Sequence, residues 1–151
     1  MKYIILLILA MTCLTLIAED TVKEEVIPQV VKLEVVADTL IATITIPPKM
    51  HMTKQEDFVY VDIEEFEGVS LSKTIWSDGA HLDELGALSY EKQAILKRSI
   101  IRDESLMSAS LKLKVFVGYQ MCFDSYCEPP EEVEIELIVP PIHCGKCPGS
   151  K

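Results

Sequence analysis

Short stretches in which polar and apolar residues alternate are the feature that most limits the folds open to this chain. The clearest is 111–117, Leu-Lys-Leu-Lys-Val-Phe-Val, and 133–139 reads Val-Glu-Ile-Glu-Leu-Ile-Val. Successive side chains of a β-strand point to opposite faces, so this period predicts strands with one buried face. If these two strands pair, the lysines of the first should lie opposite the glutamates of the second, which stabilises a sheet.

The other alternating stretches bring the total to about seven strands, and no segment predicts a long amphipathic helix. Residues 31–36 and 40–46 flank Asp38-Thr39, which predicts a β-hairpin with a tight turn. Pro47-Pro48 should end the second strand, because proline cannot donate to the hydrogen-bond ladder. Further strands are expected at 58–63, 69–75 and 87–101, with a turn near Glu67-Gly68. Evenly spaced short strands predict an all-β chain folded as an immunoglobulin-like antiparallel β-sandwich.

The N-terminal end has the layout of a secretory signal peptide. Lys2 is followed by an uncharged apolar stretch that ends at Ala18, and the first acidic residue is Glu19. A basic start, an apolar centre and a small residue before a polar switch are typical of such a peptide. The stretch is shorter than the roughly 20 residues that a membrane-spanning helix needs. We therefore expect residues 1–18 to be a cleaved signal and 19–25 an acidic leader, with an uncleaved N-terminal anchor as the alternative.

The chain is acidic, with 24 Asp and Glu against 14 Lys and Arg and a formal net charge of −10. A surface of this sign repels phosphate groups, which argues against nucleic acid and against anionic membranes as partners. Together with the signal peptide, the charge predicts an exported, periplasmic domain without stable membrane insertion after cleavage.

Of the five cysteines, the four that follow the signal peptide fall in two close pairs, Cys122 with Cys127 and Cys144 with Cys147. Disulfides persist outside the cytosol, so export and paired cysteines fit together. Four cysteines allow three connectivities, and proximity in the sequence favours the two local ones.

Cys122 and Cys127 bracket what the strand pattern predicts to be the connection of a hairpin, which can bring them within reach of a disulfide. One interpretation is a structural staple, although so short a loop gives only about 2 kcal/mol in the loop-entropy model. The other is a pair that cycles between dithiol and disulfide, which needs an accessible thiolate and a nearby second thiol. The spacing leaves both interpretations open.

The residues around this pair resemble the N-terminal periplasmic domain of the thiol:disulfide interchange protein DsbD. The resemblance rests on Tyr119-Gln120, Cys122, Cys127 and Pro129-Pro130, followed by a final strand. Weaker marks lie upstream in matching order, at Pro47–His51, Leu71–Trp76, His81–Gly86 and Tyr90. The resemblance covers roughly residues 26 to 140, which we expect to form one DsbD-like domain.

The resemblance implies an immunoglobulin-like sandwich that passes reducing equivalents to exported thiol proteins, without a cofactor. Cys122 and Cys127 match the redox pair, with Cys127 as the expected nucleophile and Cys122 as the resolving thiol. The implied enzyme class is a thiol:disulfide oxidoreductase of the protein-disulfide reductase type. Because this sequence lacks the family's membrane and thioredoxin-like parts, the expected electron donor is a separate membrane electron transporter or thioredoxin-like protein.

The resemblance also assigns a cap loop to Asp83, Glu84 and Leu85, which would shield the pair until a partner docks. Leu85 departs from the family, in which an aromatic residue is typical, and the two cysteines are one residue closer together than in the best-studied members. In so acidic a chain, plain surface positions are the favoured interpretation of Asp83 and Glu84. Tyr119 and Tyr126 fit either a face for partner docking or half-buried positions in the sandwich. Trp76 is expected in the core.

Residues 141–151 are expected to form a flexible tail, and its His143, Cys144 and Cys147 provide an alternative function. Together with Met50–Met52 they offer soft ligands suited to copper or zinc, although a fourth zinc ligand is missing. A passive local disulfide in the tail, and apolar strand-end positions for the two methionines, are the plainer interpretations. A further alternative is a non-catalytic β-sandwich interaction domain with a structural disulfide.

Overall fold

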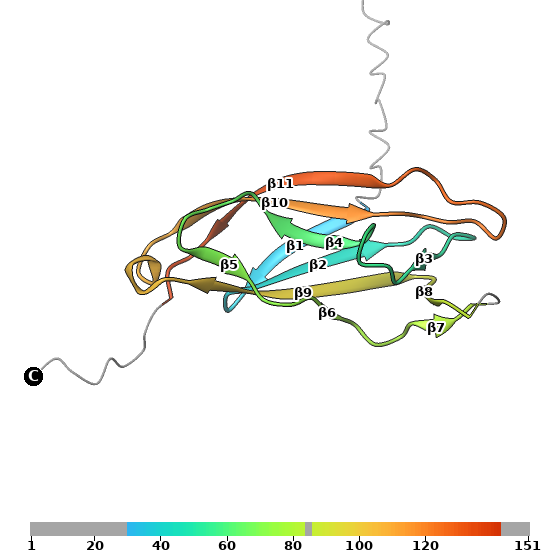
Figure 1. Cartoon of the computed structure of the whole chain (residues 1–151), viewed down its shortest axis with the longest axis horizontal. Coiled ribbons are helices and arrows are strands. Elements are labelled where there is room, and N and C mark those ends of the chain that lie inside the picture. Colours follow the sequence, from blue (N-terminus) through green and yellow to red (C-terminus); the bar gives the residue numbers. More distant parts are fainter. Residues whose placement is uncertain (1–29, 84–85, 143–151) are drawn as a thin grey trace, which may run out of the picture.

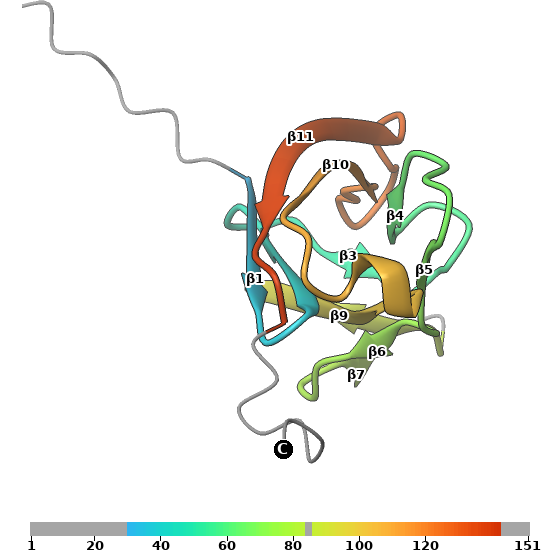
Figure 2. The same cartoon turned by 90° about the vertical axis from the view of Figure 1, so that its left-hand side faces the viewer.

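The computed structural model describes residues 30–83 and 86–142. Two antiparallel layers face each other across a single apolar core (Figure 1, Figure 2). The signal peptide predicted at 1–18, the acidic leader at 19–25 and the cysteine-bearing part of the tail lie outside the described residues. The domain boundaries at 26 and 140 therefore stay predictions.

The first layer is built around its longest strand, β9, which pairs with β2 along one edge and with two short strands along the other. Every pairing in it is antiparallel. Its strands are β1 (Val31–Val36), β2 (Thr39–Thr45), β5 (Val69–Leu71), β6 (Ile75–Trp76) and β9 (Gln93–Arg102).

The second layer is a sheet of three antiparallel strands with β10 in the middle. It consists of β11 (Glu131–Val139), β10 (Leu111–Tyr119) and β4 (Tyr60–Ile63). A third, smaller sheet lies at one end of the molecule and contains β3 (Met52–Thr53), β8 (Leu88–Tyr90) and β7 (His81–Leu82) (Figure 1). A single 3₁₀ turn, η1 (Glu104–Leu106), follows β9.

The core is made mainly by every second residue of the facing strands β2, β9 and β10, as the alternating sequence predicts. Side chains from both layers are almost completely buried there: Leu40, Ala42 and Ile44 of β2, Ala94 and Leu96 of β9, and Leu111, Leu113, Val115 and Val117 of β10. This pattern confirms the all-β class and the immunoglobulin-like antiparallel sandwich. Within the described ranges, no helix has the length and apolar composition needed to cross a membrane.

The predicted pairing of the last two long strands, β10 and β11, is confirmed, and so are its charge pairs. Lys112 Nζ lies 2.8 Å from Glu136, and Lys114 Nζ lies 3.2 Å from Glu134, each pair running diagonally across the ladder. All four side chains lie on the solvent side, where such pairs contribute only a few tenths of a kcal/mol each.

The first hairpin is confirmed, but its turn lies one residue earlier than predicted. Val36 pairs with Thr39, so the loop is Ala37-Asp38, and both loop residues have positive φ, 46° and 57°. Two such residues form the turn whose twist matches that of antiparallel strands. Thr39 cannot be a turn residue, because it also pairs with Ser99 of β9.

The strands predicted at 69–75 and 87–101 are each divided in two. Between β5 and β6, the Ser72 hydroxyl accepts a hydrogen bond from the Ser99 N–H, so a side chain interrupts the backbone ladder. Arg98 donates to the Ser72 carbonyl at 2.7 Å and holds the interruption in place. Between β8 and β9, the chain turns at Glu91-Lys92.

A buried guanidinium closes the end of the sandwich that carries the first hairpin turn. The Arg102 side chain is fully buried and pairs with the carboxylate of Asp38. It also donates to the carbonyls of Ala109 and Pro140, at 3.0 and 2.7 Å. One side chain therefore joins the turn after β1, the end of β9, the loop before β10 and the end of β11.

Gly118 in β10 is a position where the fold needs a residue without a side chain. It pairs with Tyr60 of β4, and a Cβ atom at Gly118 would overlap the Tyr60 ring. The Tyr60 hydroxyl donates to Glu132 of β11, so the ring lies across β10 from one neighbouring strand to the other. An aromatic ring over a glycine on a neighbouring strand is a known way to fill the space that glycine leaves.

We expect Gly118→Ala to lower the free energy of unfolding by about 1–3 kcal/mol, because the methyl group overpacks this contact. Denaturant unfolding of the disulfide-bonded protein measures the loss. In a Tyr60→Leu background the same substitution should cost clearly less, since the ring is gone. An equal cost in both backgrounds would contradict the assignment.

Candidate functional site

The connection between β10 and β11 carries the cysteines in a small hairpin of its own. Cys122 and Cys127 form a disulfide, with their Cα atoms 3.9 Å apart. Phe123 N–H donates to the Tyr126 carbonyl, and Glu128 N–H to the Met121 carbonyl, each at 2.8 Å. These two bonds flank the cysteines, which therefore face each other at a non-hydrogen-bonded position of an antiparallel pair, where side chains approach most closely. The predicted hairpin geometry of the pair is confirmed.

Cys122 also pairs on its other side, with His51. The His51 N–H donates to the Cys122 carbonyl and the Cys122 N–H to the His51 carbonyl, both at 2.8 Å. His51 immediately precedes β3, so this bridge ties the cysteine hairpin to the small third sheet. Cys122 is thus the middle residue of three antiparallel segments.

The two sulfur-bearing residues differ in exposure. Cys122 is 4% exposed, whereas Cys127 belongs to the exposed class, as do Asp124 and Ser125 at the hairpin tip. The difference follows from the backbone, because Cys122 has neighbours on both edges. Of the two disulfide-bonded residues, Cys127 is therefore the one that solvent reaches more readily.

Two polar side chains fix the base of the hairpin. Tyr119 is buried, and its hydroxyl donates to the carboxylate of Glu131 opposite. Burial, with that hydrogen bond as the second cause, raises the pKa of Tyr119 to about 12. Gln120 Nε2 donates to the Glu128 carbonyl at 2.9 Å, across the hairpin. Tyr119 therefore lies within the sandwich, the second of the two positions that its sequence allowed.

Tyr126 occupies the opposite kind of position. Its side chain is 59% exposed, and its ring stacks on Phe123 with centroids 4.9 Å apart. The stacked pair spans the tip of the hairpin beside the disulfide. An exposed aromatic residue of this kind suits contact with another protein.

The predicted cap residues lie at the turn between β7 and β8, of which only Asp83 belongs to the described residues. Asp83 accepts hydrogen bonds from Ala87 N at 2.8 Å and from Ser89 Oγ at 3.1 Å. These bonds hold the base of the loop that contains Glu84 and Leu85, which lie outside the described residues. In Figure 1 β7, β8 and the connection between β10 and β11 lie at the same end of the molecule.

Trp76, expected in the core, is only partly buried: it packs against the core and stacks on Tyr90, with ring centroids 6.1 Å apart. The reason is its place in a two-residue strand at the edge of the first layer. Lys54 Nζ lies 5.5 Å from the centre of its ring.

The two methionines of the alternative metal site are not placed to bind a metal ion. Met52 is completely buried and Met50 packs against the same core, so both have the apolar strand-end role. His143, Cys144 and Cys147 lie outside the described residues. Among residues 30–83 and 86–142, no group of three or more His, Cys, Asp or Glu side chains is placed to hold a metal ion.

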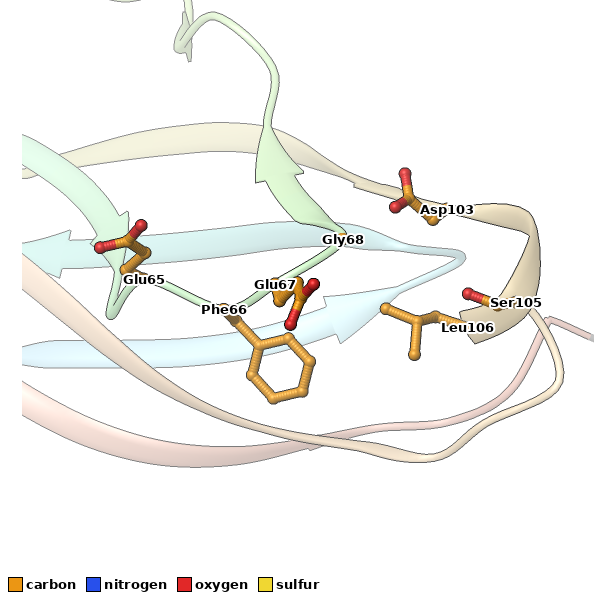
Figure 3. A pocket seen from close by; sticks show the side chains of 7 residues that line it. All are labelled: Glu65, Phe66, Glu67, Gly68, Asp103, Ser105 and Leu106. Atoms are coloured by element: carbon orange, nitrogen blue, oxygen red, sulfur yellow. The ribbon is translucent and has the colours of Figure 1, made fainter.

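A cleft of about 500 Å³ lies at the other end of the sandwich, between the β4–β5 turn and η1 (Figure 3). Its lining includes the carboxylates of Glu65, Glu67 and Asp103, which lie apart from one another in Figure 3. The remaining lining residues are Phe66, Gly68, Ser105 and Leu106. The cleft is remote from the disulfide and brings together no set of groups for catalysis.

Sequence reasoning missed His51 as a neighbour of the cysteines. His51 and Cys122 are 71 positions apart in the sequence, and no local pattern links them. The one signal in the sequence is the alternation Met50-His51-Met52. Because the two methionines pack against the core, the His51 side chain has to point to the other face.

In the reduced protein, we expect alkylation of Cys127 to be at least about tenfold faster than that of Cys122, because only the exposed thiol is accessible. A short pulse of iodoacetamide followed by peptide mass spectrometry measures the ratio. The chain should carry Cys13→Ser, Cys144→Ser and Cys147→Ser, so that two thiols remain. In denaturant the two rates should become similar. Equal rates in the folded protein would contradict the assigned difference in access.

No protein-family model matches this sequence, and no curated protein sequence is significantly similar to it. Among solved structures, the fold is similar to a chain in the structure of the complex between the DsbD N-terminal and the PilB N-terminal domains from Neisseria meningitidis. The sequences are 18% identical, the TM-score is 0.51, and the match covers 71% of this chain and 80% of that one. At this identity the comparison shows the fold alone, an immunoglobulin-like β-sandwich that resembles the DsbD N-terminal domain.

Proposed function

We propose that this protein is an exported thiol–disulfide exchange domain that passes reducing equivalents to periplasmic thiol partners through Cys122 and Cys127. The observation that carries the proposal is the asymmetric disulfide. One sulfur belongs to an exposed hairpin residue, and the other to a residue that is buried and held on both edges. Exchange needs this arrangement, because one thiol meets the partner while the second stays close enough to resolve the intermediate.

A purely structural role explains the pair less well. The disulfide links residues five positions apart, and a loop this short gives only about 2 kcal/mol in the loop-entropy model. The hairpin is already held by Gln120, by its own backbone hydrogen bonds and by the bridge to His51. The sandwich has an extensive apolar core without it.

The chemistry is a two-step exchange in which atoms and electrons balance. The Cys127 thiolate attacks a partner disulfide, forms a mixed disulfide and releases one partner thiolate, which takes up a proton. Cys122, having lost its proton, then attacks the Cys127 sulfur and releases the second partner thiolate. The partner gains two electrons and two protons in total, and the Cys122–Cys127 disulfide is restored.

The surroundings of the pair support docking of another protein. Tyr126 and Phe123 form a stacked pair beside the exposed sulfur. We assign Asp83, Glu84 and Leu85 to a loop that covers this end of the molecule until a partner binds. The donor in this scheme is a separate membrane electron transporter or thioredoxin-like protein, and the acceptors are exported thiol proteins. Residues 1–18 supply the export signal.

The reduction potential of the pair should lie within the range of exchange proteins, from about −120 to −270 mV. Equilibration of the folded chain with glutathione or dithiothreitol buffers, followed by alkylation and mass measurement, gives the value. A potential far below about −300 mV would identify a structural disulfide and refute the proposal.

Cys122→Ser should trap partners, because the mixed disulfide on Cys127 then has no resolving thiol. Non-reducing gels of cells that express the variant should show adducts that a reductant removes, and mass spectrometry identifies the proteins. Cys127→Ser should yield far fewer adducts, since Cys122 is buried. Both single variants should also carry Cys144→Ser and Cys147→Ser, so that the tail cannot react. Equal trapping by both would contradict the roles assigned to the two cysteines.

A further inference from the structure

His51, Cys122 and Cys127 form one row across three antiparallel segments. His51 is directly opposite Cys122, and Cys122 is directly opposite Cys127. Residues directly opposite each other in an antiparallel pair extend their side chains from the same face, with Cβ atoms about 4.5–5.5 Å apart. The imidazole and both sulfur atoms therefore share a face, with the Cys122 sulfur in the middle.

The burial of the neighbouring residues agrees with this placement. Met52 and Met121, one residue after His51 and one residue before Cys122, both point into the apolar core. Alternation along each segment then turns His51 and Cys122 away from the core. His51 itself is partly exposed.

The buried position of Cys122 makes its deprotonation unfavourable, and an imidazole beside it can accept the proton. To resolve a mixed disulfide Cys122 must become a thiolate, and a thiolate is unfavourable where water is largely excluded. Exposed Cys127 does not share this difficulty, because water solvates its thiolate directly. A proton acceptor is therefore needed at Cys122 in particular.

We propose that His51 is the acid–base group for Cys122, an inference that rests on the proposed exchange function. In the resolving step, neutral imidazole takes the Cys122 proton as the sulfur attacks Cys127, and the partner leaves as a thiolate. In the reverse direction, a partner thiolate attacks Cys127, and imidazolium returns the proton to Cys122 as it leaves.

Other charged groups on the surrounding elements are less suited to the task. Lys49 and Lys54 flank His51 on its own segment, and Asp124 and Glu128 lie on the hairpin. Ammonium and carboxylate groups ordinarily titrate far from neutral pH, whereas imidazole ordinarily titrates close to it.

On the third sheet, the carboxylate of Asp83 bonds to Ala87 and Ser89, and the Tyr90 hydroxyl donates to the Ser77 carbonyl. His81 lies 3.2 Å from Glu91. Among the described residues, only His51 combines a direct bridge to Cys122 with an imidazole ring.

The test separates the two thiol steps in one experiment. The chain with Cys13→Ser, Cys144→Ser and Cys147→Ser is reduced and mixed with dithiobis(nitrobenzoate) in a stopped-flow instrument. A fast phase reports attack by Cys127, and a second phase reports release of the second coloured thiolate when Cys122 closes the disulfide. His51→Gln is compared with His81→Gln, a matched change at the other described histidine.

His51→Gln should slow the second phase by about 10- to 100-fold near neutral pH and leave the first phase unchanged. In the parent chain the second phase should level off above neutral pH. In His51→Gln it should keep rising about tenfold per pH unit, because solvent must then remove the proton. The two profiles should meet at high pH, where the thiol ionises without help. His81→Gln should behave as the parent.

Three outcomes would overturn the proposal: an unchanged second phase, equal slowing of both phases, or parallel pH profiles. If His51→Gln does not fold, as judged by circular dichroism, His51→Asn provides the same comparison with a smaller amide. The second phase needs only a folded dithiol, so it can show a His51 effect even if the reduction potential refutes the proposed function. The converse result, a suitable potential without a His51 effect, would leave the proposed function intact and remove His51 from it.

Discussion

The register of β10 is the constraint on which the rest of the structure depends. Its alternate residues from Leu111 to Val117 fill the core, and it pairs with β11 on one edge and β4 on the other. A slip by one residue would turn the lysines of this strand into the core, so the hydrophobic pattern fixes a single register. The register carries on beyond the strand: it places Tyr119 opposite Glu131 and Met121 in the core, and so directs Cys122 to the other face. The chemistry at the hairpin is thus positioned by burial that occurs residues away.

The two ends of the sandwich are built on different principles. At one end, Arg102 is buried and joins four segments through Asp38 and two backbone carbonyls, so that loss of one partner would leave a buried charge without compensation. At the other end, the cysteine hairpin is held mainly by backbone bonds and by Gln120, while its tip stays exposed. The contacts that stabilise the fold are therefore largely separate from the cysteine hairpin. Reduction of the disulfide would leave in place the core contacts that hold the two layers together.

The sequence predicts those parts of the fold in which a single segment contains a clear pattern, such as a long alternation of polar and apolar residues. The strands at 111–119 and 131–139 have long period-two patterns, and a cysteine pair between them predicts a hairpin directly. Two-residue strands such as β3, β6 and β7 have no period of their own, because their pairing is decided by longer neighbours. The shift of the first turn to Ala37-Asp38 has a similar origin, since Thr39 pairs with Ser99 of β9. The bridge from His51 to Cys122 joins distant parts of the chain and is set by how the third sheet meets the second layer.

The acidity of the hairpin region also bears on how the pair would work. Asp124 and Glu128 lie on the hairpin itself, and Glu131 and Glu132 begin the strand after it. Negative charge nearby opposes formation of a thiolate, and burial of Cys122 opposes it further. Unlike reactive cysteines at helix N-termini or beside basic residues, this pair has little in its described surroundings that would stabilise a thiolate at rest. In the proposed exchange, two transient factors would therefore supply the reactivity: a partner that covers the acidic tip, and a neutral base that takes the proton only when Cys122 attacks. A histidine opposite the buried cysteine meets the second requirement without adding a permanent positive charge.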